Sequence, residues 1–152
     1  MRFVVFDTES DNLAYQATKL HVLGWKEGNE EVQTTFCYGT MREVFSREDC
    51  FFVGHNVIRH DLPLINRILG LDLKYTQFVD TLALSWYLCF NRSSHGLADW
   101  GETVGVPKPK IDDWQNLTPD EYAHRVTEDV KINYLVWKHL EKKLGTLYGW
   151  KK

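Results

Sequence analysis

RFVVFDTESDN, residues 2–12, is the stretch from which the fold of this chain can be worked out. Its apolar part, VVF at 4–6, has the β-branched and aromatic side chains typical of a strand that is buried on both faces. Side chains two positions apart on a strand point to the same face, so Asp7 and Glu9 project together if the strand continues. The sequence therefore predicts a buried strand that carries two neighbouring carboxylates at its end.

Two carboxylates this close together are unfavourable unless something compensates their charge. They repel each other, and one of them takes up a proton unless a cation neutralises the pair. Magnesium suits such a pair, because it is typically bound by one or two carboxylates with the other positions left to water and substrate phosphate. The alternative is that DTESD is a solvated acidic turn, since most acidic residues are exposed.

Apolar runs further along the chain predict the rest of a sheet. Residues 19–25 and 31–38 have strand character, and Gly28 and Asn29 between them favour a turn. The first three strands would then form an antiparallel meander. CFFVGHN, at 50–56, is a fourth short apolar run that ends as the chain turns at its glycine.

The second half of the chain has helical spacing. Apolar residues recur at helical intervals after Asp61 and stop at Gly70, and TLALSWYLCF (81–90) has helical length and apolar content. Ser94 is the predicted cap of a helix that Gly105 and Pro107 end, and Thr118, Pro119 and Glu121 have the spacing of the N-cap, N1 and capping box of a long helix. We expect an α/β fold with a mixed β-sheet, an antiparallel meander plus parallel strands, flanked by α-helices, as a single domain over residues 1–152.

Composition limits the class of protein. A chain of 152 residues with 43% hydrophobic residues and six Trp is long enough to bury roughly 70% of its unfolded surface. A net charge of -3 does not indicate a strongly basic nucleic-acid binder, but an acidic metal site would subtract locally from a basic surface. Three cysteines without CxxC spacing argue against a disulfide framework and a zinc site. Met1 is followed by only one short apolar run, and no stretch of about 18 apolar residues occurs, so we expect a cytoplasmic protein without a signal peptide or membrane contact.

Two further acidic residues stand in unusual places. Asn56 and Asp61 lie five positions apart around the loop before a predicted helix, where Asp61 alone could be an ordinary N-cap. Asp129 falls in the middle of the last predicted helix, among apolar residues, where Asp is a poor helix former. A carboxylate near a packing face needs a partner, and a metal or cationic site supplies one. His124, five residues earlier, is expected about one turn away and near the same side.

Three segments, FDTES, HNVIRHDLPLI and HRVTEDVKIN, resemble the three motifs of the DEDD superfamily of 3'-to-5' exonucleases, in their usual order. The resemblance covers roughly residues 3–142 and implies a ribonuclease H-like fold. SSHGLADWGETVG followed by KPKIDDW also resembles the segment between the second and third motifs in proofreading exonuclease domains of phage family A DNA polymerases.

The resemblance implies a set of catalytic and metal-binding residues. Asp7 and Glu9 match the first motif, Asp61 the second and Asp129 the third. It implies two divalent cations, Mg²⁺ or Mn²⁺, one held by Asp7, Glu9 and Asp129, and the second shared by Asp7, with Asp61 acting partly through water. In the general two-metal mechanism one ion activates the attacking water and the other stabilises the leaving oxygen. The expected products are nucleoside 5'-monophosphates.

The general base departs from the polymerase pattern. That branch has a Tyr four residues before the last Asp, where this chain has Arg125, and the other branch has a His five residues before it, where this chain has His124. An imidazole can take a proton near neutral pH, and an arginine cannot. We therefore predict His124 as the catalytic base and a His-type third motif; the alternative is an exposed helix histidine.

Further residues are predicted to contact substrate: Thr8, Asn56, His95 and Arg125. Asn56 could instead fix its loop, and His95 could have a structural role at a helix end. Trp86, Trp100 and Trp114 are either core residues or stacking surfaces for bases. The candidates for phosphate contact, or for solvated surface positions, are Lys108, Lys110, Arg59, Arg92 and Arg125.

Together these features predict a metal-dependent exonuclease that shortens DNA from its 3' end, with single-stranded DNA as the expected substrate. The resemblance suggests a phage-encoded enzyme in the host cytoplasm that works beside a separate polymerase or other replication proteins. An exoribonuclease or oligoribonuclease with the same chemistry is the first alternative, because the sugar is recognised by local groups. The second is a catalytically silent nucleic-acid-binding module, which would not need four acids facing phosphates.

Overall fold

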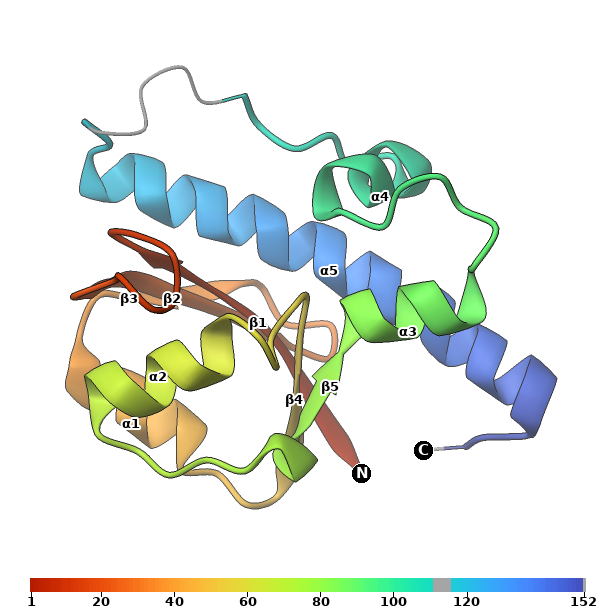
Figure 1. Cartoon of the computed structure of the whole chain (residues 1–152), viewed down its shortest axis with the longest axis horizontal. Coiled ribbons are helices and arrows are strands. Elements are labelled where there is room, and N and C mark those ends of the chain that lie inside the picture. The colour runs from red at the N-terminus through yellow and green to blue at the C-terminus, as the bar shows by residue number, and fades with distance from the viewer. Residues whose placement is uncertain (111–115, 152) are drawn as a thin grey trace.

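A five-stranded mixed sheet forms the centre of the computed structural model, which describes residues 1–110 and 116–151 (Figure 1). The strands are β1 (Arg2–Ser10), β2 (Leu20–Glu27), β3 (Gln33–Thr35), β4 (Cys50–Gly54) and β5 (Phe78–Asp80). Their order is β3-β2-β1-β4-β5, in which β3, β2 and β1 pair antiparallel and β4 and β5 continue the sheet parallel to β1. The predicted meander plus parallel strands is confirmed.

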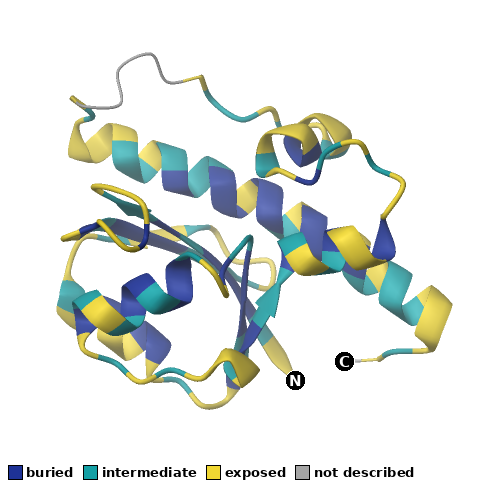
Figure 2. Ribbon diagram, viewed as in Figure 1, coloured by how far each residue is buried: buried dark blue, intermediate teal, exposed yellow. Residues whose placement is uncertain are grey.

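Helices cover both faces of this sheet. They are α1 (Tyr38–Phe45), α2 (Asp61–Leu69), α3 (Thr81–Leu88), α4 (Leu97–Val104) and α5 (Pro119–Tyr148), with a 3-10 turn η1 (Tyr75–Gln77) before β5. One face packs against α1 and α2, whereas α5 crosses the other face; α3 follows β5 and packs beside α5, and α4 packs on α5 away from the sheet (Figure 1). The middle of α5 is buried and its ends are mostly exposed (Figure 2). None of the helices in the described ranges has the length and apolar character needed to cross a membrane.

The side chains of β1 alternate between the two layers of helices. Val4 and Phe6 belong to the core that β1 shares with α1 and α2. Val5 packs with Val130 of α5, in the core on the opposite face. Because the alternation continues past the apolar residues, odd-numbered positions at the end of β1 face α5 and even-numbered positions face α2.

The predicted helix ends are largely observed. Helix α2 spans 61–69 and ends at Gly70, whose φ of 66° is the left-handed conformation that glycine adopts without strain. The Thr118 side chain accepts a hydrogen bond from the Glu121 N–H at 3.2 Å, with Pro119 as the first residue of α5. The end of α2 and the start of α5 therefore define the two helices that carry the acidic residues of the second and third motifs.

Other boundaries differ from the prediction. Only Gln33–Thr35 of the predicted strand at 31–38 is extended, and Tyr38 begins the unpredicted helix α1. The β-forming residues just before α1 concealed its start. Strand β5 is only three residues long and leaves no periodic pattern.

The first turn of α4 also differs from the prediction. Gly96, and not Ser94, is its N-cap, since the Ser94 hydroxyl donates to the Asp99 carboxylate. Part of the KPKIDDW segment, with Trp114, lies outside the described residues.

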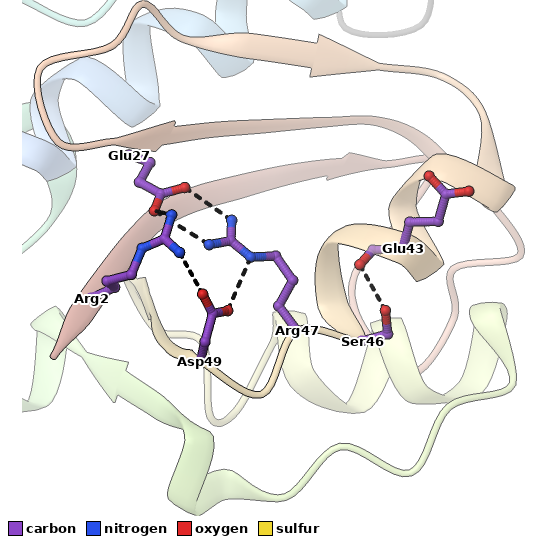
Figure 3. A network of polar contacts seen from close by, with 6 residues as sticks. All are labelled: Arg2, Glu27, Glu43, Ser46, Arg47 and Asp49. Carbon is purple, nitrogen blue, oxygen red and sulfur yellow. Dashed lines mark hydrogen bonds and ion pairs between the residues drawn. The ribbon is translucent and has the colours of Figure 1, made fainter.

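A network of polar contacts lies at the N-terminal end of β1, away from the acidic end of this strand (Figure 3). Arg47 binds Glu27 of β2 through two guanidinium nitrogens, with Nη1 2.9 Å from Oε2 and Nη2 3.3 Å from Oε1. Arg2 of β1 also pairs with Glu27, and both arginines reach Asp49, before β4. Exposed ion pairs contribute little individually, but this network joins the ends of three segments.

Candidate functional site

Three carboxylates from two distant segments meet at the end of β1. Asp7 and Glu9 project from the face of β1 that α5 covers, and Asp129 lies in the middle of α5. One oxygen of each lies within 4.8 Å of the others. Gly24, the partner of Asp7 in β2, has no side chain, and a Cβ there would lie 3.0 Å from Val126 Cγ1. This glycine therefore lets α5 approach the sheet closely enough to bring Asp129 to the strand.

Burial makes this cluster a poor place for negative charge. Burial, followed by the charges of Asp129 and Glu9, holds the pKa of Asp7 well above its usual range. Burial raises the pKa of Glu9 to about 7, even though the Arg125 charge acts in the opposite direction. The pKa of Asp129 is raised by burial too, against the effect of Lys108. At neutral pH such a cluster keeps protons or takes up a cation.

A divalent cation fits this donor set. Oxygen ligands from carboxylates are what Mg²⁺ and Mn²⁺ prefer. Asp129 Oδ1 is buried and has no hydrogen-bond partner among the described residues, which leaves it available as a ligand. The residues that could hold a metal are therefore Asp7, Glu9 and Asp129.

Asp61 stands beside this cluster and outside it. It is 4% exposed at the start of α2, and its Oδ1 accepts a 2.6 Å hydrogen bond from the Thr8 hydroxyl. The alternative that Asp61 is an N-cap is wrong, because His60 occupies that position. The charge of Asp61 is near enough to raise the pKa of Asp7 further. Asp61 is thus placed to act next to the three-carboxylate cluster.

Two cationic side chains reach the carboxylates. Lys108 Nζ lies 3.2 Å from Asp129 Oδ2, and Arg125 Nε lies 3.0 Å from Glu9 Oε1. The side chains of Lys108 and Arg125 are only 27% and 12% exposed, respectively. The site thus combines carboxylates that can bind a cation with lysine and arginine side chains that can bind an anion.

All these groups line one cleft of about 530 Å³. Its wall is formed by Asp7, Thr8, Glu9, Ser10, Asp11, Asn12, Leu13, His55, Asn56, His60, Asp61, Leu97, Lys108, Leu117, Tyr122, Arg125 and Asp129. The cleft brings together the ends of β1, β4 and α2 with one face of α5, so residues from all three predicted motifs meet in it.

The helix geometry of α5 places His124 away from this cleft. Tyr122, Arg125 and Asp129 are spaced so that they lie on one face of the helix, and all three line the cleft. His124 is exposed and is not part of the cleft wall. Five residues of a regular helix turn through about 500°, which puts His124 about 140° away from Asp129. The expectation that five residues bring the imidazole to the same side was therefore wrong.

The predicted substrate-binding residues are distributed differently. Asn56 lines the cleft in a left-handed conformation, with φ of 62°, and its N–H donates to Asp80 Oδ1 at 2.9 Å. Thr8 also lines the cleft, but its hydroxyl is engaged by Asp61. His95 is 3% exposed and is absent from the cleft wall. The structure therefore corrects the prediction for His95 to an interior position.

Two histidines in the cleft wall were not singled out from the sequence. His60 Nδ1 lies 3.7 Å from Asp61 Oδ2, and the interaction with Asp61 raises the pKa of His60. His55 Nδ1 lies 2.9 Å from Thr81 Oγ1, while burial lowers the pKa of His55. The signal for His60 was its position directly before Asp61. His55 had no signal, because its partners are distant in the sequence.

No protein-family model matches this sequence, and no curated protein matches it. Solved structures do resemble the fold. Brucella melitensis NrnC with bound Mg²⁺ is 18% identical with a TM-score of 0.72, over 95% of this chain and 74% of that one. Escherichia coli Exonuclease I in complex with a dT13 oligonucleotide is 12% identical with a TM-score of 0.71, over 97% of this chain and 42% of that one. Escherichia coli RNase D, an exoribonuclease involved in structured RNA processing, is 19% identical with a TM-score of 0.63, over 97% and 41%.

This likeness covers nearly all of the chain. Similarity at these low identities shows the fold, and the fold is the ribonuclease H-like mixed sheet that these nucleases share. The predicted fold class is therefore confirmed. What the chain does with this fold depends on its own side chains.

The position of His124 leads to a direct test. We expect His124→Ala to change the rate of any reaction in the cleft by no more than about twofold, because the imidazole is exposed, lies outside the cleft wall and contributes little to stability. Loss of a general base would instead lower the rate by about 10² to 10⁴. Rates of the purified variant and parent on the same substrate distinguish these outcomes, and a drop in the larger range would restore His124 as the base.

Proposed function

We propose that this protein is a metal-dependent 3'-to-5' exonuclease that hydrolyses phosphodiester bonds. The observation that carries this proposal is the buried cluster of Asp7, Glu9 and Asp129 in an open cleft, with Asp61 beside it. Burying three carboxylates together is costly unless a cation holds them. Neither a structural core nor a simple binding surface requires this arrangement.

The roles of the chain's own residues follow from their positions. Asp7, Glu9 and Asp129 would hold one divalent cation, and Asp7 with Asp61 would serve a second. Bound cations of this kind supply activation of water and stabilisation of the leaving oxygen. Thr8 fixes the orientation of Asp61 through its hydroxyl. Lys108 and Arg125 are positioned to bind a phosphate group that approaches the acids.

The substrate that we propose is a DNA 3' end, with single-stranded DNA favoured. Exonuclease I, one of the similar folds, is described in complex with a dT13 oligonucleotide. RNA is a second candidate because RNase D, another similar fold, is described as an exoribonuclease. Release of nucleoside 5'-monophosphates, a phage origin, action beside a polymerase and a cytoplasmic location stay predictions.

Digestion of end-labelled strands tests the proposal. With Mg²⁺ or Mn²⁺ the parent protein is expected to convert 5'-labelled single-stranded DNA into a ladder that shortens from the 3' end, with nucleoside 5'-monophosphates as products. The same strand labelled at its 3' end should release labelled mononucleotide at once, and a matched RNA strand measures the sugar preference. Asp129→Asn is the negative control, because it removes the charge of a buried ligand without changing its shape. A parent that shortens neither polymer with either metal would leave a silent binding module as the better explanation.

A further inference from the structure

Trp86 is an exposed aromatic residue that the fold holds in a fixed position. It is 59% exposed on α3, which follows β5 and packs beside α5 (Figure 1). One face of its indole stacks on the imidazole of His95, with ring centroids 3.9 Å apart and an angle of 24° between the planes. His95 is itself buried, and its Nδ1 lies 2.6 Å from Ser85 Oγ. One face of the indole thus packs on a buried imidazole, while most of the side chain remains exposed to solvent.

This support is continuous with the cleft. The carbonyl oxygen of His95 accepts a 2.8 Å hydrogen bond from Nε2 of His55, which lines the cleft wall. The other ring nitrogen of His55 contacts Thr81, the first residue of α3. Trp86, His95 and His55 therefore form one connected series of contacts from the surface of α3 to the candidate active site.

The neighbouring tryptophan shows what an ordinary core position looks like here. Trp100 is 1% exposed, and its indole N–H donates to Ser85 Oγ at 2.9 Å. Trp86 stacks on the histidine of this hydrogen-bonded Ser85–His95 pair but keeps most of its surface in water. A rigid, open aromatic face beside a nucleic-acid cleft is well suited to stacking, which accepts any base because every base has a π-face.

We propose that Trp86 is a stacking platform for an unpaired base of the strand that leads into the cleft, upstream of the 3'-terminal nucleotide. This inference rests on the proposed exonuclease function and specifies its substrate as a single strand several nucleotides long. Bases within a duplex are already stacked on both faces, so only an unpaired strand can use the platform. Stacking acts on the base and not on the sugar, so the platform serves DNA and RNA alike.

Comparing two substrates isolates the contribution of Trp86. The p-nitrophenyl ester of thymidine 5'-monophosphate places a terminal nucleotide in the cleft without any upstream base, whereas a single-stranded pentamer supplies upstream bases. Trp86→Ala is expected to lower the ratio of pentamer kcat/KM to reporter kcat/KM about 10-fold, mainly through the KM for the pentamer, because the stacking of one base is lost. Trp86→Phe should restore most of this ratio. Parallel dT5 and U5 substrates are expected to show the same loss.

A fluorescent base reports the stacking itself. We would place 2-aminopurine at each of the last five positions of the strand and record its quenching by the protein in EDTA. At one upstream position the quenching is expected to fall at least threefold in Trp86→Ala and to persist in Trp86→Phe. Tyr87→Ala is the matched control, because Tyr87 is an exposed aromatic residue of the same helix that pairs with Tyr148 instead of His95.

The outcomes separate this inference from the proposed function. If the parent hydrolyses neither reporter nor pentamer, the exonuclease proposal fails. If the parent cuts both and Trp86→Ala leaves their ratio and the quenching unchanged, the platform is refuted while the exonuclease stands. An equal fall on both substrates, without a change in quenching, would make Trp86 a structural support for His95 and would also overturn the proposal. A change of oligomeric state in Trp86→Ala with an unchanged ratio would instead assign this surface to a second copy of the chain.

Discussion

Asp7→Asn is expected to abolish the proposed nuclease activity and, at the same time, to stabilise the protein in EDTA. Asp7 is central to the cluster, and burial together with the charges of Asp129, Glu9 and Asp61 raises its pKa. Loss of groups that merely support metal ligands already costs about 10- to 100-fold, so loss of a ligand should exceed 100-fold. The neutral amide removes repulsion within the cluster and should add of the order of 1 kcal/mol to the free energy of unfolding at pH 8. Steady-state rates and urea unfolding measure the two effects.

Asp11→Asn provides the matched control for stability. Asp11 lines the same cleft, but hydrogen bonds from Thr18 and Lys19 outweigh the effect of burial and hold its pKa at about 2. Its amide variant is therefore expected to lose stability at pH 8, in the opposite direction to Asp7→Asn. If Asp7→Asn were also destabilising, or kept its activity, the carboxylate cluster would have a structural role and the site assignment would be wrong.

The second large effect is a pH-dependent response to divalent metal. Burial raises the folded-state pKa of Glu9 from its ordinary 4.5 to about 7, and burial also raises those of Asp7 and Asp129. A carboxyl group with a raised folded-state pKa contributes stability below its unfolded pKa, and that stability is lost as the pH rises through the folded value. In EDTA the melting temperature should therefore fall between about pH 4.5 and pH 7. Differential scanning calorimetry across this range measures it.

Added Mg²⁺ or Mn²⁺ should reverse this loss. A ligand at 100 times its Kd stabilises by about 2.7 kcal/mol. For a chain of this length that corresponds to a rise of roughly 5 to 10 °C in melting temperature. The rise should be larger at pH 8 than at pH 5, because the ligand carboxyls must lose their protons before they bind metal. Asp129→Asn should remove most of the response, and an equal metal effect at both pH values would contradict the cluster as the binding site.

The grouping of Asp7, Glu9 and Asp129 could be predicted because the first and third motifs of the resemblance contain them and each stands where a carboxylate needs a partner. Asp7 and Glu9 lie at the polar end of a buried strand, and Asp129 interrupts an apolar helix face. The alternation of side chains along β1 and the helix ends at Gly70 and Thr118 could also be predicted, because these features depend only on residues that are close in the sequence.

The remaining features depend on contacts between distant residues. His124 was misplaced because a motif gives only the number of residues between two side chains. In a regular helix that number also sets the angle between them about the helix axis, and five residues do not bring them to the same side. His95 was misplaced because its burial depends on Ser85 and Trp86 of α3, ten and nine positions earlier in the chain. Lys108 stood among several basic residues with equal claims, and only the folded chain shows that it reaches Asp129.

The alternation of β1 means that the hydrophobic core also sets the aim of the reactive groups. Val5 and Asp7 are consecutive positions on one side of the same strand, and Val4, Phe6 and Thr8 are consecutive positions on the other. The apolar residues at one end of the strand and the acidic residues at the other end belong to one rigid element. A change in core packing that rotates or shifts β1 therefore also moves the carboxylates, so activity is expected to be sensitive to core packing. Selection for activity in this protein would therefore also preserve residues that never touch a substrate.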